Sequence, residues 1–167
     1  MDERTLAQQF LNYSAGKLRE LSSRVDVCLD QLTEEQVWVR GKESENAVGN
    51  LVLHLCGNVG QWIVSTIGNR PDTRNRPSEF AARGTATKDQ LRERLSTTIE
   101  SALAVIEQLT PAQLAARHTI QGYEVSVLEA IYHVVEHFSM HTGQIIFATK
   151  LLTAADLGFY RHLEAVP

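Results

Sequence analysis

The sequence has few cysteines, no long apolar run and no excess of basic residues, and each shortage argues against a class of protein. Cys28 and Cys56 are the only cysteines; they form no CxxC pair and fit a reducing interior. The apolar runs are far shorter than the ~18 residues that a membrane span needs. The net charge is -4, and no stretch combines dense Lys and Arg with aromatic residues, so nucleic acid is not an expected partner. The first ten residues, MDERTLAQQF, are charged and polar, unlike a secretory signal. We therefore expect a cytoplasmic protein that does not bind a membrane.

The remaining composition is that of an ordinary globular protein. The chain has 167 residues, of which 43% are apolar and 22% charged. This length suits one domain, residues 1–167, that is large enough to bury a core.

Four segments show helical periodicity of their apolar residues. They run from about Glu3 to Leu32, Ala47 to Gly68, Lys88 to Leu109 and Ser126 to Leu152. Asn46 is a candidate N-cap of the second segment, and Thr87 and Gln90 have capping-box spacing at the start of the third. The β-branched residues follow helical spacing rather than alternation, so no strand is expected. The sequence predicts an all-α four-helix bundle.

A weak internal repeat follows the first and third helical segments. QLTEEQVW, residues 31–38, and QLTPAQLA, residues 108–115, each read as a helix end followed by a short turn capped by Thr. Pro111 occupies the position of a first helical residue. We expect two related helical hairpins.

The longest connection is GNRPDTRNRPSEFAARGTATKD, residues 68–89. Its Pro, Gly, Asp and Asn content predicts a crossover loop between the second and third helices. Its arginines are expected to be solvated loop charges, and the alternative is a rim that attracts anions to a site. They are Arg70, Arg74, Arg76 and Arg83.

Three histidines lie four residues apart in the fourth segment, at His133, His137 and His141. Positions four apart on a helix differ by ~40° and ~6 Å, so two neighbours can bind one ion, whereas the outer two lie ~12 Å apart and cannot. His137 and His141 lie along small or apolar residues that suit a bundle interior. His133 shares its side with Glu129 and Glu136, and we expect it at the surface or against a ligand. The better pair is His137 and His141.

The second helical segment supplies a candidate third ligand in His54, which lies among leucines and valines where an uncompensated polar group is costly. Asn50, Asn58 and Gln61 extend its face into a polar stripe, which we expect to form one wall of a pocket. Cys56 lies ~200° round the helix from His54 and is not a natural ligand. Two readings stay open at this point: a metal site, or a hydrogen-bonded core histidine beside a chance histidine pair.

Two motifs together resemble the DinB/YfiT-like metalloproteins, the damage-inducible bundle family. They are His54 within LVLHLCGN, and His137, His141, Gly143 and Gln144 within HFSMHTGQ. The resemblance covers essentially the whole chain. It implies a four-helix bundle in up-down-down-up order, often a homodimer, that binds one divalent metal, commonly zinc or nickel, through His54, His137 and His141. His133 matches a histidine that is frequent in the family and is not one of its usual ligands.

The resemblance leaves the reaction open, because characterised relatives include transferases and isomerases that use a low-molecular-weight thiol, and metal-dependent hydrolases, while many branches have no assigned activity. Three histidines leave a fourth metal position for a thiol or a water. No carboxylate shares a helix face with the three histidines, and Glu136 points ~100° from His137, which favours a thiol over hydrolysis. Gln144, Asn58 and Gln61 are candidates to position a small polar substrate. The non-enzymatic alternative is a metal-binding, ligand-binding or structural dimer.

Overall fold

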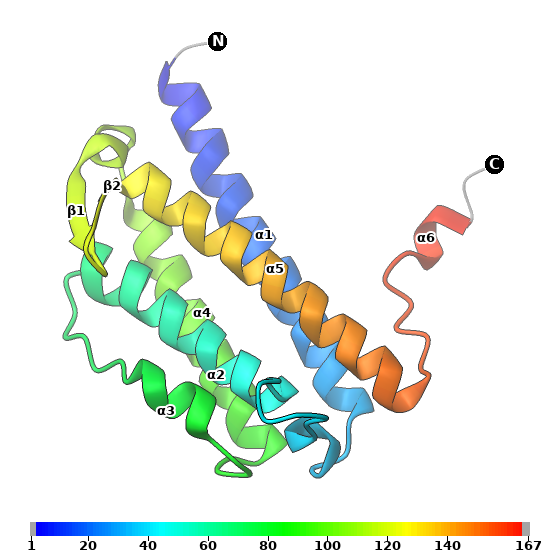
Figure 1. Cartoon of the computed structure of the whole chain (residues 1–167). Coiled ribbons are helices and arrows are strands. Elements are labelled where there is room, and N and C mark those ends of the chain that lie inside the picture. Colours follow the sequence, from blue (N-terminus) through cyan, green and yellow to red (C-terminus); the bar gives the residue numbers. More distant parts are fainter. Residues whose placement is uncertain (1–2, 165–167) are drawn as a thin grey trace.

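The computed structural model describes residues 3–164, and these residues are mostly helical (Figure 1). This confirms the predicted helical class. The long helices are α1 (Glu3–Gln31), α2 (Val48–Val59), which continues directly into the π-helical turns of η2 (Gly60–Ile67), α4 (Lys88–Gln108) and α5 (Val127–Thr153). The short elements are η1 (Gln36–Trp38), α3 (Arg76–Ala81), η3 (Pro111–Ala115), β1 (Arg117–Ile120), β2 (Tyr123–Ser126) and α6 (Arg161–Glu164). None of the described helices has the length and apolar character to cross a membrane.

The start of α4 has the predicted cap, whereas the start of α2 does not. Thr87 and Gln90 form a reciprocal capping box, in which the side chain of each accepts a hydrogen bond from the backbone N–H of the other. Asn46 was expected to cap α2, but Ala47 occupies that position, and the Asn50 side chain accepts a hydrogen bond from the N–H of Ala47 at 3.1 Å. The acceptor for this free N–H therefore comes from inside the helix instead of from the residue before it.

The two short turns of the internal repeat are both 3₁₀ turns that begin with a Thr–Gln pair, but the two pairs bond differently. Thr33 and Gln36 exchange two backbone–side-chain hydrogen bonds at the start of η1. At η3 the Gln113 side chain accepts from both the N–H and the hydroxyl of Thr110, and Pro111 is the first helical residue, as predicted.

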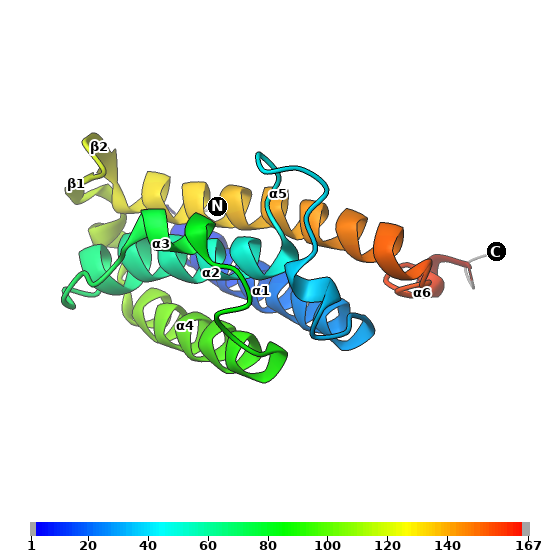
Figure 2. The ribbon, with the colours of Figure 1, turned by 60° about the horizontal axis from the view of Figure 1, so that its bottom comes forward.

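The long helices pack around one apolar core, with α1 and α2 each lying against both α4 and α5. Contacts at one end show the helix directions. Lys88 Nζ, at the start of α4, donates to the carbonyl of Leu32 beyond the end of α1, and Gln36 Nε2 donates to the carbonyl of Leu152 near the end of α5. Helices α1 and α5 therefore run in one direction and α4 in the other, as Figures 1 and 2 show.

A small β-hairpin, β1 and β2, corrects the expectation that no strand is present (Figure 1). Gln121 and Gly122 form its turn with φ values of 54° and 85°, the positive pair that a two-residue hairpin turn requires. The strands have only four residues each, too few for their alternation to stand out against helical spacing. His118, which we expected in a loop, lies in β1, and the side chain of His162 lies outside the described residues.

The connection 68–89 is also more ordered than a plain crossover loop, because it contains α3. Asn75 caps this helix by accepting from the N–H of Ser78. Asn50 then fastens α3 to α2, since its amide donates to the carbonyls of Glu79 at 2.8 Å and Ala82 at 3.0 Å. The crossover segment is thereby held against the helix that carries His54.

Candidate metal centre

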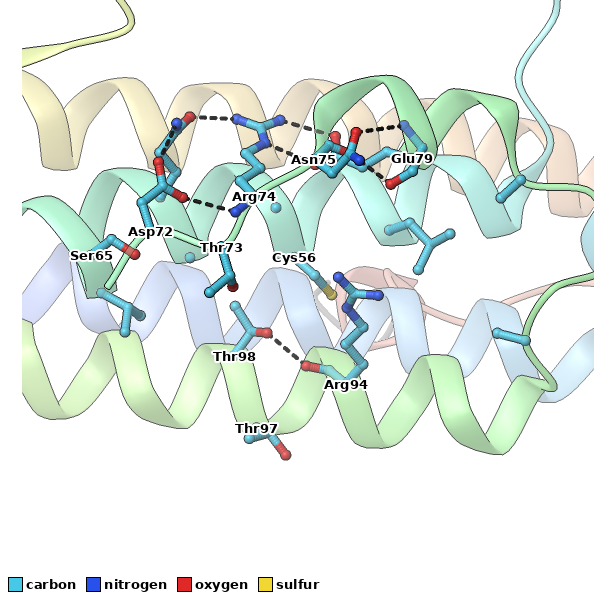
Figure 3. A pocket seen from close by; sticks show the side chains of 18 of the residues that line it. Cys56, Ser65, Asp72, Thr73, Arg74, Asn75, Glu79, Arg94, Thr97 and Thr98 are labelled. Carbon is cyan, nitrogen blue, oxygen red and sulfur yellow. Dashed lines mark hydrogen bonds and ion pairs between the residues drawn. The ribbon is translucent and has the colours of Figure 1, made fainter. Parts of the chain in front are cut away.

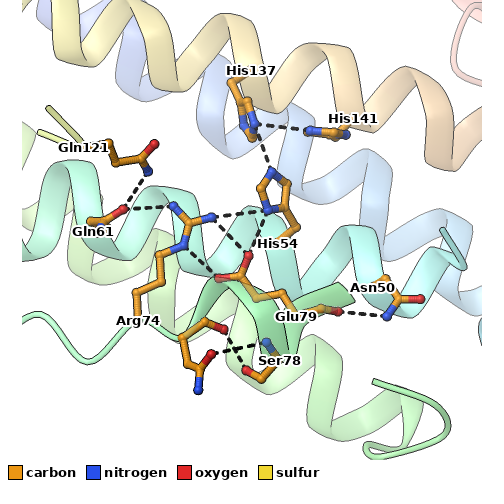
Figure 4. A network of polar contacts seen from close by, with 10 residues as sticks. Asn50, His54, Gln61, Arg74, Ser78, Glu79, Gln121, His137 and His141 are labelled. Atoms are coloured by element: carbon orange, nitrogen blue, oxygen red, sulfur yellow. Dashed lines mark hydrogen bonds and ion pairs between the residues drawn. The ribbon is translucent and has the colours of Figure 1, made fainter. Parts of the chain in front are cut away.

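His54 on α2 and His137 and His141 on α5 point their imidazole rings at one another (Figure 4). Nε2 of His137 lies 3.1 Å from Nε2 of His54 and 3.2 Å from Nε2 of His141. The three residues offer ligand atoms that all lie within 4.8 Å of one another, so together they could hold a metal ion. Tetrahedral Zn²⁺ with bonds of about 2.0–2.1 Å places its ligand nitrogens about 3.3 Å apart. The separations of His137 Nε2 from Nε2 of His54 and of His141 are close to this value.

The outer nitrogens of two of the rings fix where their protons lie. Nδ1 of His54 lies 2.9 Å from a carboxylate oxygen of Glu79, and Nδ1 of His141 lies 2.7 Å from Oε1 of Gln144. Both of these partners are acceptors, which favours a proton on each Nδ1. Nη2 of Arg74 also lies 3.2 Å from Nδ1 of His54, but it is closer to the Glu79 oxygen, at 3.0 Å, so we assign its hydrogen bond to the carboxylate. Each Nε2 is then left with a lone pair directed at the other rings, which is the tautomer that binds a metal.

His137 has no arrangement of its single proton that satisfies the cluster. Its Nδ1 is buried and has no hydrogen-bond partner among the described residues. If its proton is on Nε2, it can be donated to Nε2 of His54 or to Nε2 of His141, but not to both. If its proton is on Nδ1, the Nε2 lone pairs of all three histidines point at one another. Burial, together with the fields of His141 and His54, lowers the pKa of His137 to about 3, so the ring is neutral near pH 7. A divalent cation satisfies all three nitrogens, and the donor set therefore fits such an ion.

A buried carboxylate–guanidinium pair contacts Nδ1 of His54, and no sequence pattern predicts it. Arg74 Nε donates to Glu79 Oε1 at 2.8 Å, and Arg74 Nη2 lies 3.0 Å from the Glu79 oxygen that His54 contacts. The two side chains are only 4% and 5% exposed. The expectation that Arg74 is a solvated loop charge is therefore wrong. Its partner Glu79 lies on α3 and its neighbour His54 on α2, a long-range contact that local spacing cannot reveal.

The electrostatics of Glu79 are set by these two partners. Burial alone would raise the pKa of its carboxyl, but the hydrogen bonds from His54 and Arg74 outweigh burial and hold the pKa below its usual range. Gly57 makes room for the pair, because a Cβ at that position would lie 1.9 Å from Oε1 of Glu79 and 2.9 Å from Nε of Arg74. An ionised Glu79 thus accepts the proton of His54 in a space shaped by a glycine.

The four residues predicted to line a pocket do not share hydrogen-bond partners. They are Asn50, Asn58, Gln61 and Gln144. Asn50 is occupied with α3, as described above, and Gln144 contacts His141. Gln61 accepts from Arg74 at 3.0 Å and donates to Asp72 at 2.8 Å. Asn58 is buried, and its Oδ1 has no partner among the described residues.

His133 lies next to the cluster without joining it. Its ring stacks on Trp62, with centroids 4.1 Å apart, and its centroid lies 5.5 Å from that of His137. Burial lowers the pKa of His133. The group that could hold a metal does not include it.

The fold and this site define a mostly helical protein with a three-histidine group suited to a metal ion. A family model described as "Protein of unknown function (DUF1572)" matches residues 5–161, and the chain belongs to this family. No curated protein matches the chain. A crystal structure from Enterococcus faecalis, described as that of the conserved protein of a locus, is similar in fold, with a TM-score of 0.71 and 17% identity over 86% of this chain and 97% of that one.

Proposed function

We propose that this chain is a DinB/YfiT-like four-helix bundle, in up-down-down-up order, that binds one divalent metal, zinc or nickel, through His54, His137 and His141. The observation that carries the proposal is the convergence of three Nε2 atoms, with separations of 3.1 and 3.2 Å around His137. The side-chain partners of the two outer rings support it, because they leave unprotonated nitrogens facing His137. The packing of α1 and α2 against both α4 and α5 supports the bundle.

The metal would be an activating centre for a small-molecule thiol. A divalent ion held by three imidazoles would have a coordination position left for a thiol or a water. It would supply Lewis-acid activation of the molecule in that position. His137 and His141 are half-buried rather than fully enclosed, so a small molecule can approach from solvent. Glu79 contacts Nδ1 of His54, the nitrogen directed away from the other two rings. No Asp or Glu joins the metal-holding group among the described residues, which favours a thiol substrate over hydrolysis.

Cobalt substitution tests the thiol proposal without relying on an assay of turnover. We expect Co²⁺-loaded protein to develop thiolate-to-metal charge-transfer absorption when L-cysteine is added, and none when L-serine is added. The His141→Ala variant, measured in parallel, should lose the band. An unchanged spectrum with L-cysteine in protein that holds one equivalent of cobalt would contradict thiol binding while leaving the metal site intact.

We also propose that the chain forms a homodimer through the outward face of α5. Five large apolar side chains are 42–71% exposed along this helix with helical spacing. They are Leu128, Tyr132, Met140, Phe147 and Leu151. Glu129, Glu136 and Lys150 lie on the same face, so two chains would meet through a mixed surface in which these five side chains supply the apolar contacts.

A further inference from the structure

A cavity lies beside the Glu79–Arg74 pair, and both of these residues line it (Figure 3). It is open to solvent and is lined by α2 and η2, residues 71–86 of the crossover, and α4, and its volume is about 760 Å³. Small-molecule sites usually have volumes of about 300–1,000 Å³. His54, His137 and His141 are not among its lining residues, so a molecule in this crossover cavity would not be the ligand of the metal.

Seven hydroxyl side chains line the crossover cavity, and four of them are available to a ligand as acceptors. These four use their hydrogen on a backbone carbonyl, which leaves oxygen lone pairs for a ligand. They are Ser65, Ser78, Thr98 and Ser101, with donor–acceptor distances of 2.7–3.2 Å. A ligand that fits this wall carries hydroxyl or amine donors of its own.

Arg94 supplies a cation that no carboxylate of the described residues pairs with. Its side chain reaches from α4 toward Cys56 on α2, within the lining of the cavity (Figure 3). The other lining arginine, Arg74, has its donors directed at Glu79 and Gln61. Arg94 is therefore the group in this cavity that is free to bind an anion, and its planar guanidinium suits a carboxylate or a phosphate.

We propose that the crossover cavity binds a small organic anion rich in hydroxyl or amine groups, such as a sugar phosphate or a sugar acid. Its anionic group would lie on Arg94, and its donors would face the hydroxyl oxygens of α4 and the crossover. Inorganic phosphate alone leaves the acceptors of the wall unmatched, and a neutral sugar leaves Arg94 unmatched. The site needs both features in one ligand, and its occupation does not require the metal.

Titrations followed by ¹H–¹⁵N NMR test this proposal on the whole chain, with and without added zinc. The probes are glucose 6-phosphate, glucosamine 6-phosphate and gluconate, with inorganic phosphate and glucose as partial ligands. We expect saturable shifts of the Gly57, Ser78 and Thr98 amides with at least one full probe and weaker binding of both partial ligands. Arg94→Gln should weaken binding about tenfold or more, since a hydrogen bond to a charged group is lost. Arg92→Gln, on the face of α4 that pairs with Asp26 and Asp30, should leave binding unchanged.

Three results would overturn the proposal. The first is the absence of saturable shifts with every full probe. The second is inorganic phosphate binding as tightly as the sugar phosphates, which would reduce the cavity to a simple anion site. The third is equal weakening by Arg94→Gln and Arg92→Gln. Because metal-free protein is titrated as well, failure here is distinguishable from failure of the metal-site proposal.

Discussion

Glu79 accepts a hydrogen bond from Nδ1 of His54 at 2.9 Å, which joins the crossover segment to the helix that carries the first histidine of the cluster. The bond holds the proton of His54 on Nδ1 and leaves the lone pair of Nε2 facing α5. Arg74 keeps Glu79 ionised and in place by two further contacts. The crossover therefore acts as a support for the metal ligands, and its role can be tested separately from theirs.

Replacing Glu79 should weaken metal binding without removing a ligand. Glu79→Gln loses the charge that holds both His54 and Arg74, and we expect zinc affinity to fall about 10–100-fold, as for other carboxylates that orient metal-binding histidines. Competition with a chromophoric chelator measures the change. Glu43→Gln, at an exposed position before α2, is the matched control. Equal affinities of Glu79→Gln and the control would show that the pair does not position His54.

Gly57→Ala tests the same support without changing any polar group. The new Cβ would displace Glu79 and Arg74, and we expect a loss of about 1–3 kcal/mol in the free energy of unfolding from overpacking, together with weaker zinc binding. Gly60→Ala is the control, because nothing lies within 4 Å of a Cβ there. Chemical denaturation and chelator competition give the two readouts. A Gly57→Ala protein as stable and as metal-avid as Gly60→Ala would contradict the close packing at Glu79.

The thiol of Cys56 should be unreactive in the folded protein. Burial raises its pKa to about 11, so about one thiol in a thousand is ionised at pH 8, and the side chain is almost fully enclosed. We expect iodoacetamide at pH 8 to label Cys56 only after denaturation, as followed by mass spectrometry of the native and unfolded chain. Rapid labelling of Cys56 under native conditions would show that this part of α2 opens readily.

The outward face of α5 should hold two copies of the chain together. Phe147→Asp places a charge among the exposed apolar side chains of this face, and we expect sedimentation to change from dimer to monomer with the helical content retained. Glu93→Gln, at an exposed position on α4 away from α5, should leave the dimer unchanged. A wild-type chain that sediments as a monomer at micromolar concentration would refute the dimer proposal.

The helical class and the His137–His141 pair could be predicted because both depend on local periodicity. His54 stood out only as a polar residue in an apolar segment, and its place beside the pair was implied by the family resemblance, since the contact joins residues 83 positions apart. The hairpin could not be predicted in the same way, since its strands are four residues long and depend on a turn at Gln121 and Gly122.

The support behind His54 was beyond sequence reasoning for a different physical reason. Glu79 lies 25 residues from His54, in a segment whose charged and turn-forming residues are typical of solvated loops. What buries it is tertiary packing of α3 on α2, aided by the amide of Asn50 and the space beside Gly57. Composition reports the average environment of a segment and does not identify the one carboxylate in it that packs inward.

The most direct test of the account is metal content, measured by elemental analysis on protein purified without a histidine tag. Wild-type protein should hold one equivalent of zinc or nickel after metal is added and excess removed. We expect His137→Ala to lose this stoichiometric binding, because its Nε2 lies between the other two, and His133→Ala to retain it, because His133 stacks on Trp62. No bound metal in the wild type, or equal loss in both variants, would contradict the three-histidine metal centre.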